Sequence, residues 1–425
     1  MRDTSYGGRM RSFGATESRP STARAQRGEP LDWREGDEPR RKKGRKKTRT
    51  PRWARLLVTL GVLLIVASGG FLVTAKVLLD KATGSITEVE INPGDNSVVA
   101  KGQALKGTLN ILLVGVDDGM ADGGEVRTEV ARADSIMILH VPESHDQGYI
   151  VSLPRDLWVK IPRFPKANYS GGMNKLNAAY AIGYGDAKGG GPGRAGGLEL
   201  LMSTINQELG ITFNAATTVN FTGFTTAVKQ LGGVTMYIDE KVTSVHYGTD
   251  ARGNPCTPAR FDSNMVAHTI PGCKGKIYDK GTRRLNAEEA LDYTRQREWM
   301  ELDDGDYGRQ RHQQQFIKAL VREAKAQGLT TNLPKALGLV SAVGSTLSMW
   351  TNGEKLEDWF FTLKDIAGSD IQMIKTNNGQ FNPAQINGTS AEALSPLSKE
   401  MFAALREKKI NEFLMQHPDW LGQDS

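Results

Sequence analysis

Hydrophobic residues along this chain fall into short runs rich in Ile and Val, which alternate with segments of helical periodicity. The runs predict β-strands at residues 109–116, 135–141, 149–153, 217–220 and 234–238. The periodic segments predict α-helices at residues 175–182, 198–209, 222–231, 287–296, 309–326 and 356–367. Strands that alternate with helices are typical of an α/β layer fold. A Gly-rich stretch at residues 183–197 is predicted to be a mobile loop, because it lacks the spacing of a phosphate-binding loop.

One apolar segment is too long for a strand. Residues 56–75 carry no charge over 20 positions, which is about 30 Å of helix and matches the hydrocarbon core of a bilayer. Ten Lys or Arg lie just before it, at residues 40–55, and only Lys76 and Lys81 lie close after it. This asymmetry predicts a single-pass cell-membrane protein with a cytoplasmic N-terminus and an extracytoplasmic C-terminal part. A cleaved signal peptide is the alternative, although its leader is usually far shorter.

The charge of the chain is concentrated at its N-terminus. Residues 1–55 hold 17 Lys or Arg and 7 Asp or Glu, a net charge of +10, so the other 370 residues sum to −4 within the total of +6. A nucleic-acid enzyme needs a basic surface on its folded part, so the sequence argues against nucleic acid as a partner. Residues 1–55 also nearly lack large aliphatic side chains and are predicted to be a disordered tail.

The part after residue 75 divides into a stalk at residues 76–107, a catalytic domain at residues 108–400 and a C-terminal helical extension at residues 401–425. The two cysteines, Cys256 and Cys273, both fall in the predicted exterior and predict a disulfide. A zinc site is the alternative, but His246 and His268 do not complete the tight spacing that such a site needs.

Two aspartates stand at the ends of the first predicted strands. Asp117 follows the first strand and Asp134 precedes the second, so antiparallel pairing of the two strands would bring them together. Hard oxygen ligands without Cys or His favour Mg²⁺, which binds one or two carboxylates together with phosphate oxygens and water, and Mn²⁺ is a substitute. Each acid taken alone is also compatible with ordinary turn chemistry.

Arginines gather at two other places. Arg155 and Asp156 follow a Leu-Pro pair at the end of a strand. Asn286, with Glu289 three residues on, predicts the start of a helix that ends near Arg295 and Arg297. Arg309 and Gln313 are four residues apart in the next predicted helix and therefore lie on the same face of it. Arginine binds phosphate through two parallel hydrogen bonds, so the pattern predicts a diphosphate site, with a solvated charged surface as the alternative.

These motifs together resemble the LytR-CpsA-Psr family in order and spacing. The resemblance rests on six motifs between residues 109 and 321: Val-Gly-Val-Asp117, Arg132-Ala-Asp134, Leu-Pro-Arg155-Asp156, Asn177-Ala-Ala-Tyr180, Leu231-Gly-Gly-Val234, and Arg295-Gln-Arg297 followed by Gly305-Asp306-Tyr-Gly-Arg309. It implies a three-layer αβα sandwich with a central mixed sheet and an apolar pocket for a polyprenyl chain. It also implies an enzyme that attaches wall polymers from a polyprenyl-pyrophosphate carrier to peptidoglycan.

The resemblance assigns roles to individual residues. Asp117 and Asp134 match the Mg²⁺ aspartates, and the pyrophosphate-contacting positions are matched by Arg132, Arg155, Arg295, Arg297, Arg309 and Gln313. Of these, Arg132, Arg155 and Arg297 are predicted to be catalytic, together with Asp156. Two features depart from the family pattern: the linker between Arg297 and Arg309 is about two residues longer, and His312 stands where many members carry Arg.

The predicted reaction is attack by a peptidoglycan hydroxyl on the phosphorus nearer the glycan, which needs mainly positioning and charge neutralisation. No histidine stands out in the sequence as a general base, and Asp134 and Asp156 are the candidates. Two other functions use the same residues: a pyrophosphatase that hydrolyses the lipid-linked precursor, and a non-catalytic regulator that binds it. The sequence does not identify the wall polymer, which the family relationship leaves open among teichoic acid, arabinogalactan and capsule.

Overall fold

The computed structural model describes residues 87–117, 131–185, 191–263, 266–364, 366, 371–384, 386, 388 and 390–422. The predicted tail (1–55), membrane segment (56–75) and the first part of the predicted stalk lie outside these residues. Among the helices that the structure does describe, none combines the length and apolar character needed to cross a bilayer.

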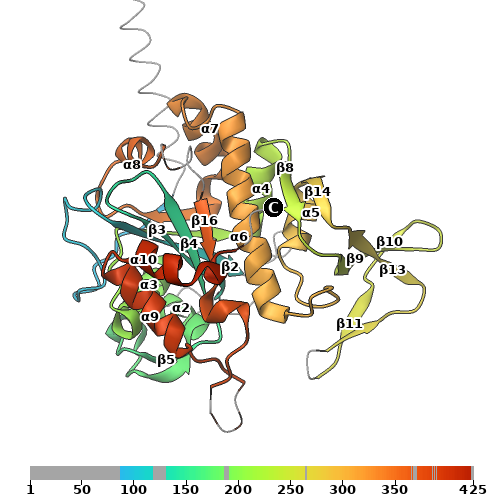
Figure 1. The fold of residues 1–425 in the computed structure, drawn as a ribbon, viewed down its shortest axis with the longest axis horizontal. Helices are drawn as coiled ribbons and strands as arrows, with labels where there is room; N and C mark the ends of the chain where they lie inside the picture. The colour runs from blue at the N-terminus through green and yellow to red at the C-terminus, as the bar shows by residue number, and fades with distance from the viewer. Residues whose placement is uncertain are drawn as a thin grey trace, which may run out of the picture. The chain divides into compact units, whose positions relative to one another are not determined.

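A seven-stranded mixed sheet forms the centre of the described chain (Figure 1). Its strands, in spatial order, are β1 (Thr87–Glu88), β15 (Leu347–Trp350), β7 (Ala215–Asn220), β2 (Leu109–Asp117), β3 (Arg132–Val141), β4 (Gly148–Leu153) and β16 (Ile371–Ile374). Three neighbouring pairs are parallel, β1–β15, β7–β2 and β4–β16, and the rest are antiparallel. The four strands predicted for this region are confirmed. Two short strands were not predicted, β15 between β1 and β7 and β16 at one edge, because four residues carry too little periodicity.

Helices pack on both faces of this sheet, because successive strand residues point to opposite sides. Leu112 and Val114 face a core shared with α2 (Leu176–Tyr184), α3 (Gly193–Leu209), α9 (Pro396–Arg406) and α10 (Ile410–Gln416). Ile111 and Leu113 face the other core, which includes residues of α6 (Gly305–Ala326) and α8 (Leu356–Leu363). Three further helices complete the described set: α4 (Phe221–Gln230), α5 (Ala287–Tyr293) and α7 (Leu333–Val343).

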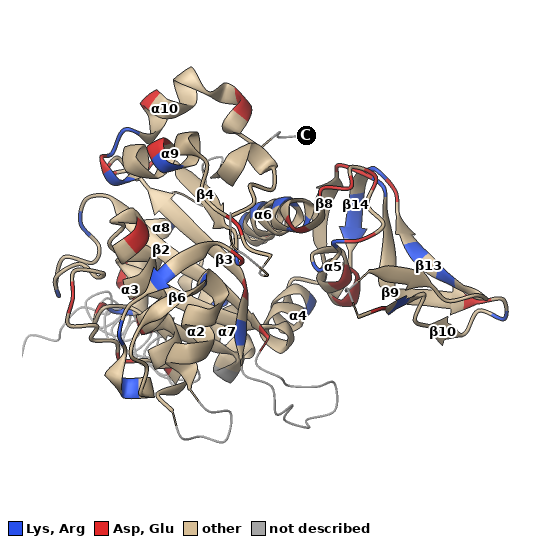
Figure 2. Ribbon diagram, turned by 90° about the horizontal axis from the view of Figure 1, so that it is seen from below, with Lys and Arg blue, Asp and Glu red and all other residues tan. Residues whose placement is uncertain are grey.

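The remaining strands form smaller sheets. A hairpin beside α2 consists of β5 (Trp158–Ile161) and β6 (Gly172–Lys175). Between α4 and α5 the chain forms β8 (Val234–Ile238), β9 (Val242–Asp250), β10 (Pro255–Cys256), β11 (Ala259–Phe261), β12 (Ala267–Thr269), β13 (Cys273–Tyr278) and β14 (Gly281–Leu285). These strands lie to one side of the seven-stranded sheet in both views (Figures 1 and 2). The predicted strand at residues 234–238 is thus present, but it pairs with β14 outside the central sheet. In the structure a disulfide links Cys256 and Cys273, as predicted.

The prediction of a mobile loop at residues 183–197 is wrong at both ends, because residues 183 and 184 end α2 and the last five residues begin α3. Residues 186–190 lie outside the described residues. Gly196 and Gly197 are buried where α3 crosses α2. A Cβ atom at Gly196 would lie 2.3 Å from the carbonyl oxygen of Gly183, so a larger residue would force the helices apart. Glycine here allows close helix packing rather than flexibility, and composition alone does not distinguish the two uses.

Both ends of the predicted catalytic domain extend further than expected. In the segment predicted as stalk, Ala104 is fully buried and Val99 donates its backbone N–H to Phe213. At the other end α9 crosses the predicted boundary at residue 400, and Met401 and Phe402 lie in the core. The residues just outside the two predicted boundaries therefore pack into the cores of the folded part, Ala104 on one face of the sheet and Met401 and Phe402 on the other.

Candidate functional site

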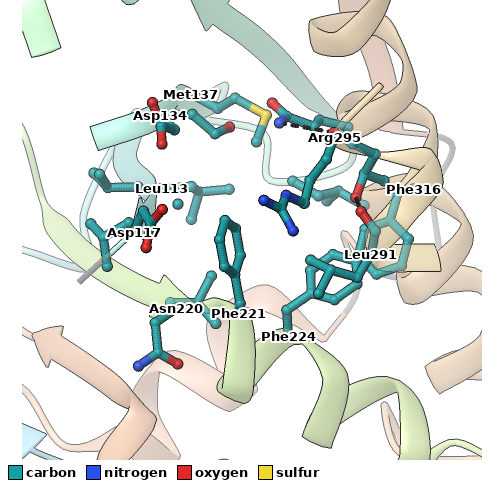
Figure 3. Close-up of a pocket in the computed structure, with 18 of the residues that line it drawn as sticks. Leu113, Asp117, Asp134, Met137, Asn220, Phe221, Phe224, Leu291, Arg295 and Phe316 are labelled. Atoms are coloured by element: carbon teal, nitrogen blue, oxygen red, sulfur yellow. Dashed lines mark hydrogen bonds between the residues drawn. The ribbon is translucent and has the colours of Figure 1, made fainter. Parts of the chain in front are cut away.

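A cavity of about 400 Å³ opens on the α6 face of the sheet, between β2, β3, β7 and the helices α4 and α6 (Figure 3). Seven of the predicted site residues line it: Asp117, Asp134, Arg155, Arg295, Arg297, Arg309 and Gln313. Figure 3 shows Asp117 and Asp134 on one side of the cavity and Arg295 and Leu291 on the other. The structure therefore brings residues from five separate segments of the chain into one cavity.

A β-bulge places Asp134 in the cavity. Gly115 of β2 pairs with Ser135 and Val116 pairs with Ala133, so Asp134 is the extra residue on β3. Such a bulge breaks the alternation of a strand and can turn two consecutive side chains to one face. Asp134 and Ser135 accordingly both line the cavity, while Ala133 lies in the core on the opposite face.

Asp134 is part of a chain of charged side chains. Nη1 of Arg155 lies 2.6 Å from Oδ1 of Asp134, and Nη2 of Arg309 lies 2.9 Å from its carbonyl oxygen. Nη2 of Arg309 also lies 2.7 Å from Oδ1 of Asp306, which is 3.7 Å from Nε of Arg155. Asp306 was not predicted as a site residue, although it belongs to the Gly-Asp-Tyr-Gly-Arg motif. Its contact with Arg155 forms only in the folded structure, where the start of α6 lies beside the residues that follow β4.

The charges in this group support one another. Burial alone would raise the pKa of Asp306, but the guanidinium groups of Arg309 and Arg155 outweigh it and lower that pKa. Burial lowers the pKa of Arg309, against the charge of Asp306. For Arg155, burial is opposed by Asp306, Asp134 and Asp156, and its pKa is raised. The acid thus stays ionised and holds two arginines in place beside the cavity.

The turn after α5 supplies the arginines on the other side. Asn286 and Glu289 form a complete capping box that begins α5, and the helix ends at Tyr293. Arg295 follows, with its guanidinium 4.5 Å from the centre of the Phe221 ring, a cation–π geometry. Gln313 of α6 donates Nε2 to the carbonyl oxygen of Thr294 at 3.3 Å, which joins this turn to α6.

The linker from Arg297 to α6 is held against the β8–β9 connection. The N–H of Thr243 donates to the carbonyl of Trp299, and the N–H of Glu301 donates to the carbonyl of Lys241, both at 3.0 Å. The longer linker is therefore paired with neighbouring backbone.

Two of the predicted catalytic residues do not line the cavity. Arg132 is exposed and pairs across the strands with Asp117. Asp156 lies 3.0 Å from Nζ of Lys175 and 3.8 Å from Nε of Arg155, so it contacts the site through Arg155. The structure places both at the edge of the group that the sequence motifs predicted as a unit.

The carboxylates of Asp117 and Asp134 fit a hard divalent cation. Both come from paired antiparallel strands and both line the cavity, where phosphate oxygens of a ligand and water would complete a Mg²⁺ shell. One cluster of three metal-type side chains occurs elsewhere in the described residues: Asp239, Glu240 and His312. None of these lines the cavity, and the guanidinium of Arg311 already binds Asp239 and Glu240. We interpret this cluster as a buried ion-pair network.

The cavity changes from charged to apolar along each element that forms it. On β2 Asp117 gives way to Leu113, and on α6 Arg309 and Gln313 are followed by Phe316 and Leu320. The apolar part of the wall comprises Leu113, Met137, Phe224, Leu291, Phe316, Ile317, Leu320 and Leu347. A site of this kind suits a ligand with an anionic head and a hydrocarbon tail.

Comparison with known proteins agrees with this geometry. The model of the LytR_cpsA_psr family matches residues 75–406. The teichoic acid transferase TagU of Oceanobacillus iheyensis, whose full name is polyisoprenyl-teichoic acid–peptidoglycan teichoic acid transferase, is 25% identical over 319 residues, covering 75% of this chain and 82% of TagU. The regulatory protein MsrR of Staphylococcus aureus is 30% identical over 240 residues, covering 56% of each chain.

A solved structure shows the same fold. Protein gbs0355 from Streptococcus agalactiae superposes with a TM-score of 0.51 at 22% identity, over 74% of this chain and 91% of that protein. The family match spans well over half of the chain and includes the segments that form the cavity. The chain therefore belongs to the LytR_cpsA_psr family.

Proposed function

We propose that this protein is a Mg²⁺-dependent phosphotransferase that moves a glycan polymer from a polyprenyl-pyrophosphate carrier to peptidoglycan through a phosphodiester. The observation that carries the proposal is a single cavity with arginines and aspartates at one end and an apolar wall beyond them. The name of the TagU relative, a polyisoprenyl-linked teichoic acid transferase, supports the same chemistry. The polymer is a teichoic acid, an arabinogalactan or a capsular glycan, and transfer assays with the lipid-linked precursor of each distinguish the three.

In this proposal the arginines bind and neutralise the diphosphate. Arg155 and Arg309 are preorganised by Asp134 and Asp306, so little reorganisation is needed when charge builds up on the phosphoryl oxygens. Asp117 and Asp134 would hold Mg²⁺, which supplies further charge neutralisation when bound. The apolar wall takes the first isoprene units and thereby sets the position of the pyrophosphate.

The products distinguish this function from its two alternatives. Purified full-length chain is incubated with a labelled polyprenyl-pyrophosphate glycan, with and without peptidoglycan. A phosphodiester-linked glycan that forms only with peptidoglycan supports the transferase. Release of glycan phosphate without acceptor identifies a pyrophosphatase. Binding of the substrate without any product supports a non-catalytic regulator, the role that is printed in the name of the relative MsrR.

We also propose that the enzyme works outside the cell, anchored by residues 56–75. The support is the charge-free length of that segment and the ten basic residues that precede it. Reporter fusions at the two ends of the chain test the orientation. A cytoplasmic signal from the C-terminal fusion would contradict the proposal.

A further inference from the structure

His246 lies on β9 and lines the cavity, although the sequence motifs assign it no role. Its side chain is about one-third exposed, and its Nδ1 atom lies 3.1 Å from Oδ1 of Asp292 on α5. Asp292 itself is completely buried. The cavity thus contains an imidazole whose inner nitrogen meets a buried carboxylate, on the α5 side that also carries Arg295 and Arg297.

The carboxylate of Asp292 is held firmly from three other directions. Oδ1 accepts hydrogen bonds from Ser244 Oγ at 3.0 Å and Gln296 Nε2 at 2.7 Å. Oδ2 accepts one from the hydroxyl of Tyr278 at 2.8 Å. Because each of these partners donates, the Asp292 oxygens act as acceptors in all three hydrogen bonds.

This arrangement selects the tautomer of His246. A carboxylate that can only accept requires Nδ1 to carry the ring proton, which leaves the lone pair on Nε2. Gln296 Nε2 is also 3.0 Å from Nδ1, but Oδ1 and the carbonyl oxygen of Asp292, at 2.7 Å and 3.1 Å, can accept its two protons. In many enzymes a buried carboxylate accepts the Nδ1–H of a histidine. This contact orients the imidazole so that Nε2 can act as a general base.

We propose that His246 is the general base that takes the proton from the acceptor hydroxyl, and that Asp292 is its positioning residue. The inference rests on the transferase proposed above. In the step, the acceptor O–H bond breaks and its proton moves to Nε2, while the acceptor oxygen forms a bond to the phosphorus nearer the glycan. The bond from that phosphorus to the bridging oxygen breaks, and polyprenyl phosphate leaves with the electron pair. The imidazolium then releases the proton to solvent.

The acids predicted from sequence are less suited to this role. Asp134 uses Oδ1 to bind Arg155 at 2.6 Å, and Asp156 does not line the cavity. Asp306 is wedged between Arg155 and Arg309, and its pKa is lowered despite its burial, so it accepts a proton poorly. An imidazole, by contrast, can take up and release a proton near neutral pH.

The charges around His246 come from the elements that contact β9, which are α5, β10, β11 and β13. On α5 and the turn after it these are Glu289, Asp292, Arg295 and Arg297, on β13 they are Lys274, Lys276 and Tyr278, on β11 Arg260 is the charge, and β10 carries none. Lys276 is bound to Glu289, which leaves Asp292 as the acid in contact with the ring. A bound pyrophosphate would balance the two arginines.

The experiment compares full-length wild type, His246→Gln and Asp292→Asn in single-turnover transfer to peptidoglycan across pH 5 to 9. We expect the wild-type rate to fall toward acidic pH, and we expect His246→Gln to lower the rate about 10²- to 10⁴-fold and to abolish that fall. Affinity for the lipid-linked substrate should stay unchanged in both variants. Asp292→Asn should lower the rate but retain a pH-dependent limb. His268→Gln, an exposed histidine bound to Asp262, is the matched control.

A second variant separates chemistry from folding. Free imidazole added to His246→Gly should restore part of the transfer, with a rate that rises with the concentration of neutral imidazole. Wild-type rates and an unchanged pH profile in His246→Gln would overturn the inference and leave the transferase intact. Absence of phosphodiester from the wild-type chain would overturn both.

Discussion

Nη1 of Arg155 lies 2.6 Å from Oδ1 of Asp134, which ties the end of β4 to the bulge in β3. The pair fixes the direction of a guanidinium that also faces Asp306. An arginine held on one side by carboxylates presents its remaining N–H groups to the cavity without first having to be ordered. Such a preorganised donor can stabilise the charge that develops in the transition state without reorienting, whereas water molecules must reorient.

Replacement of Arg155 tests this arrangement. We expect Arg155→Ala to lower transfer about 10²- to 10³-fold, because a preorganised donor is lost from the phosphoryl group. Arg155→Lys should recover only part of the rate, since an ammonium cannot form the planar, two-pronged contact. Initial rates with labelled lipid-linked glycan provide the measurement. Arg260→Ala, on the exposed strand β11, is the control, and a wild-type rate for Arg155→Ala would remove Arg155 from the mechanism.

The metal requirement can be tested at Asp117. Asp117→Asn should raise the Mg²⁺ concentration for half-maximal transfer by at least about tenfold, since even outer-shell partners of a metal contribute that much to affinity. Titration of chelator-treated protein with Mg²⁺ measures the effect, and Mn²⁺ binding followed by paramagnetic resonance measures it without activity. Asp279→Asn, at an exposed position, is the control. Equal metal affinity in Asp117→Asn and wild type would show that the cation binds elsewhere.

The apolar wall makes a prediction about lipid length. Ala227 lines the cavity from α4, so Ala227→Phe should fill space that the proposed isoprene units occupy. We expect KM for a long-chain polyprenyl substrate to rise roughly tenfold, a cost within the 1–3 kcal/mol typical of apolar pockets. KM for an analogue with one or two isoprene units should change less. Ala227→Ser preserves the volume and serves as the control; an equal effect on both lipids would argue against a hydrocarbon in this cavity.

Glu392 predicts how stability depends on pH. Its side chain is buried, and burial raises its pKa to about 7 against the hydrogen bond that it accepts from Tyr307 at 2.6 Å. Between the usual glutamate pKa and about 7 the folded protein binds more protons than the unfolded chain. Stability from this group is therefore present at low pH and lost as pH rises through that window, by about 3 kcal/mol at most.

Denaturant unfolding of wild type and Glu392→Gln at pH 4.5 to 8 measures this effect. The difference in free energy of unfolding between the two should change across the window, with Glu392→Gln relatively more stable at the alkaline end. A constant difference at all pH values would mean that Glu392 titrates normally in the folded protein.

The main strands and helices were predictable because their periodicity is local. The strand predicted at residues 109–116 differs from β2 by one residue at its end, and the helix predicted at residues 222–231 differs from α4 by one residue at each end. Glycine-rich α3 was misread at its start because Gly196 serves a contact with Gly183 that lies outside any sequence window. The same limit hid β15 and β16, whose four residues become strands through their neighbours.

The sequence also determined the residue types of the site. The charge and ligand preference of a carboxylate or a guanidinium group follow from the residue type alone. Ordered motifs identified Asp117, Asp134 and five arginines. Both aspartates and four of the five arginines line the cavity. Only the tertiary structure decided which side chains meet. It placed Asp306 between Arg155 and Arg309, left Arg132 at the rim, and brought His246 of β9 to Asp292 of α5, 46 residues away. Such contacts depend on a bulge and on helix packing, which no local pattern encodes.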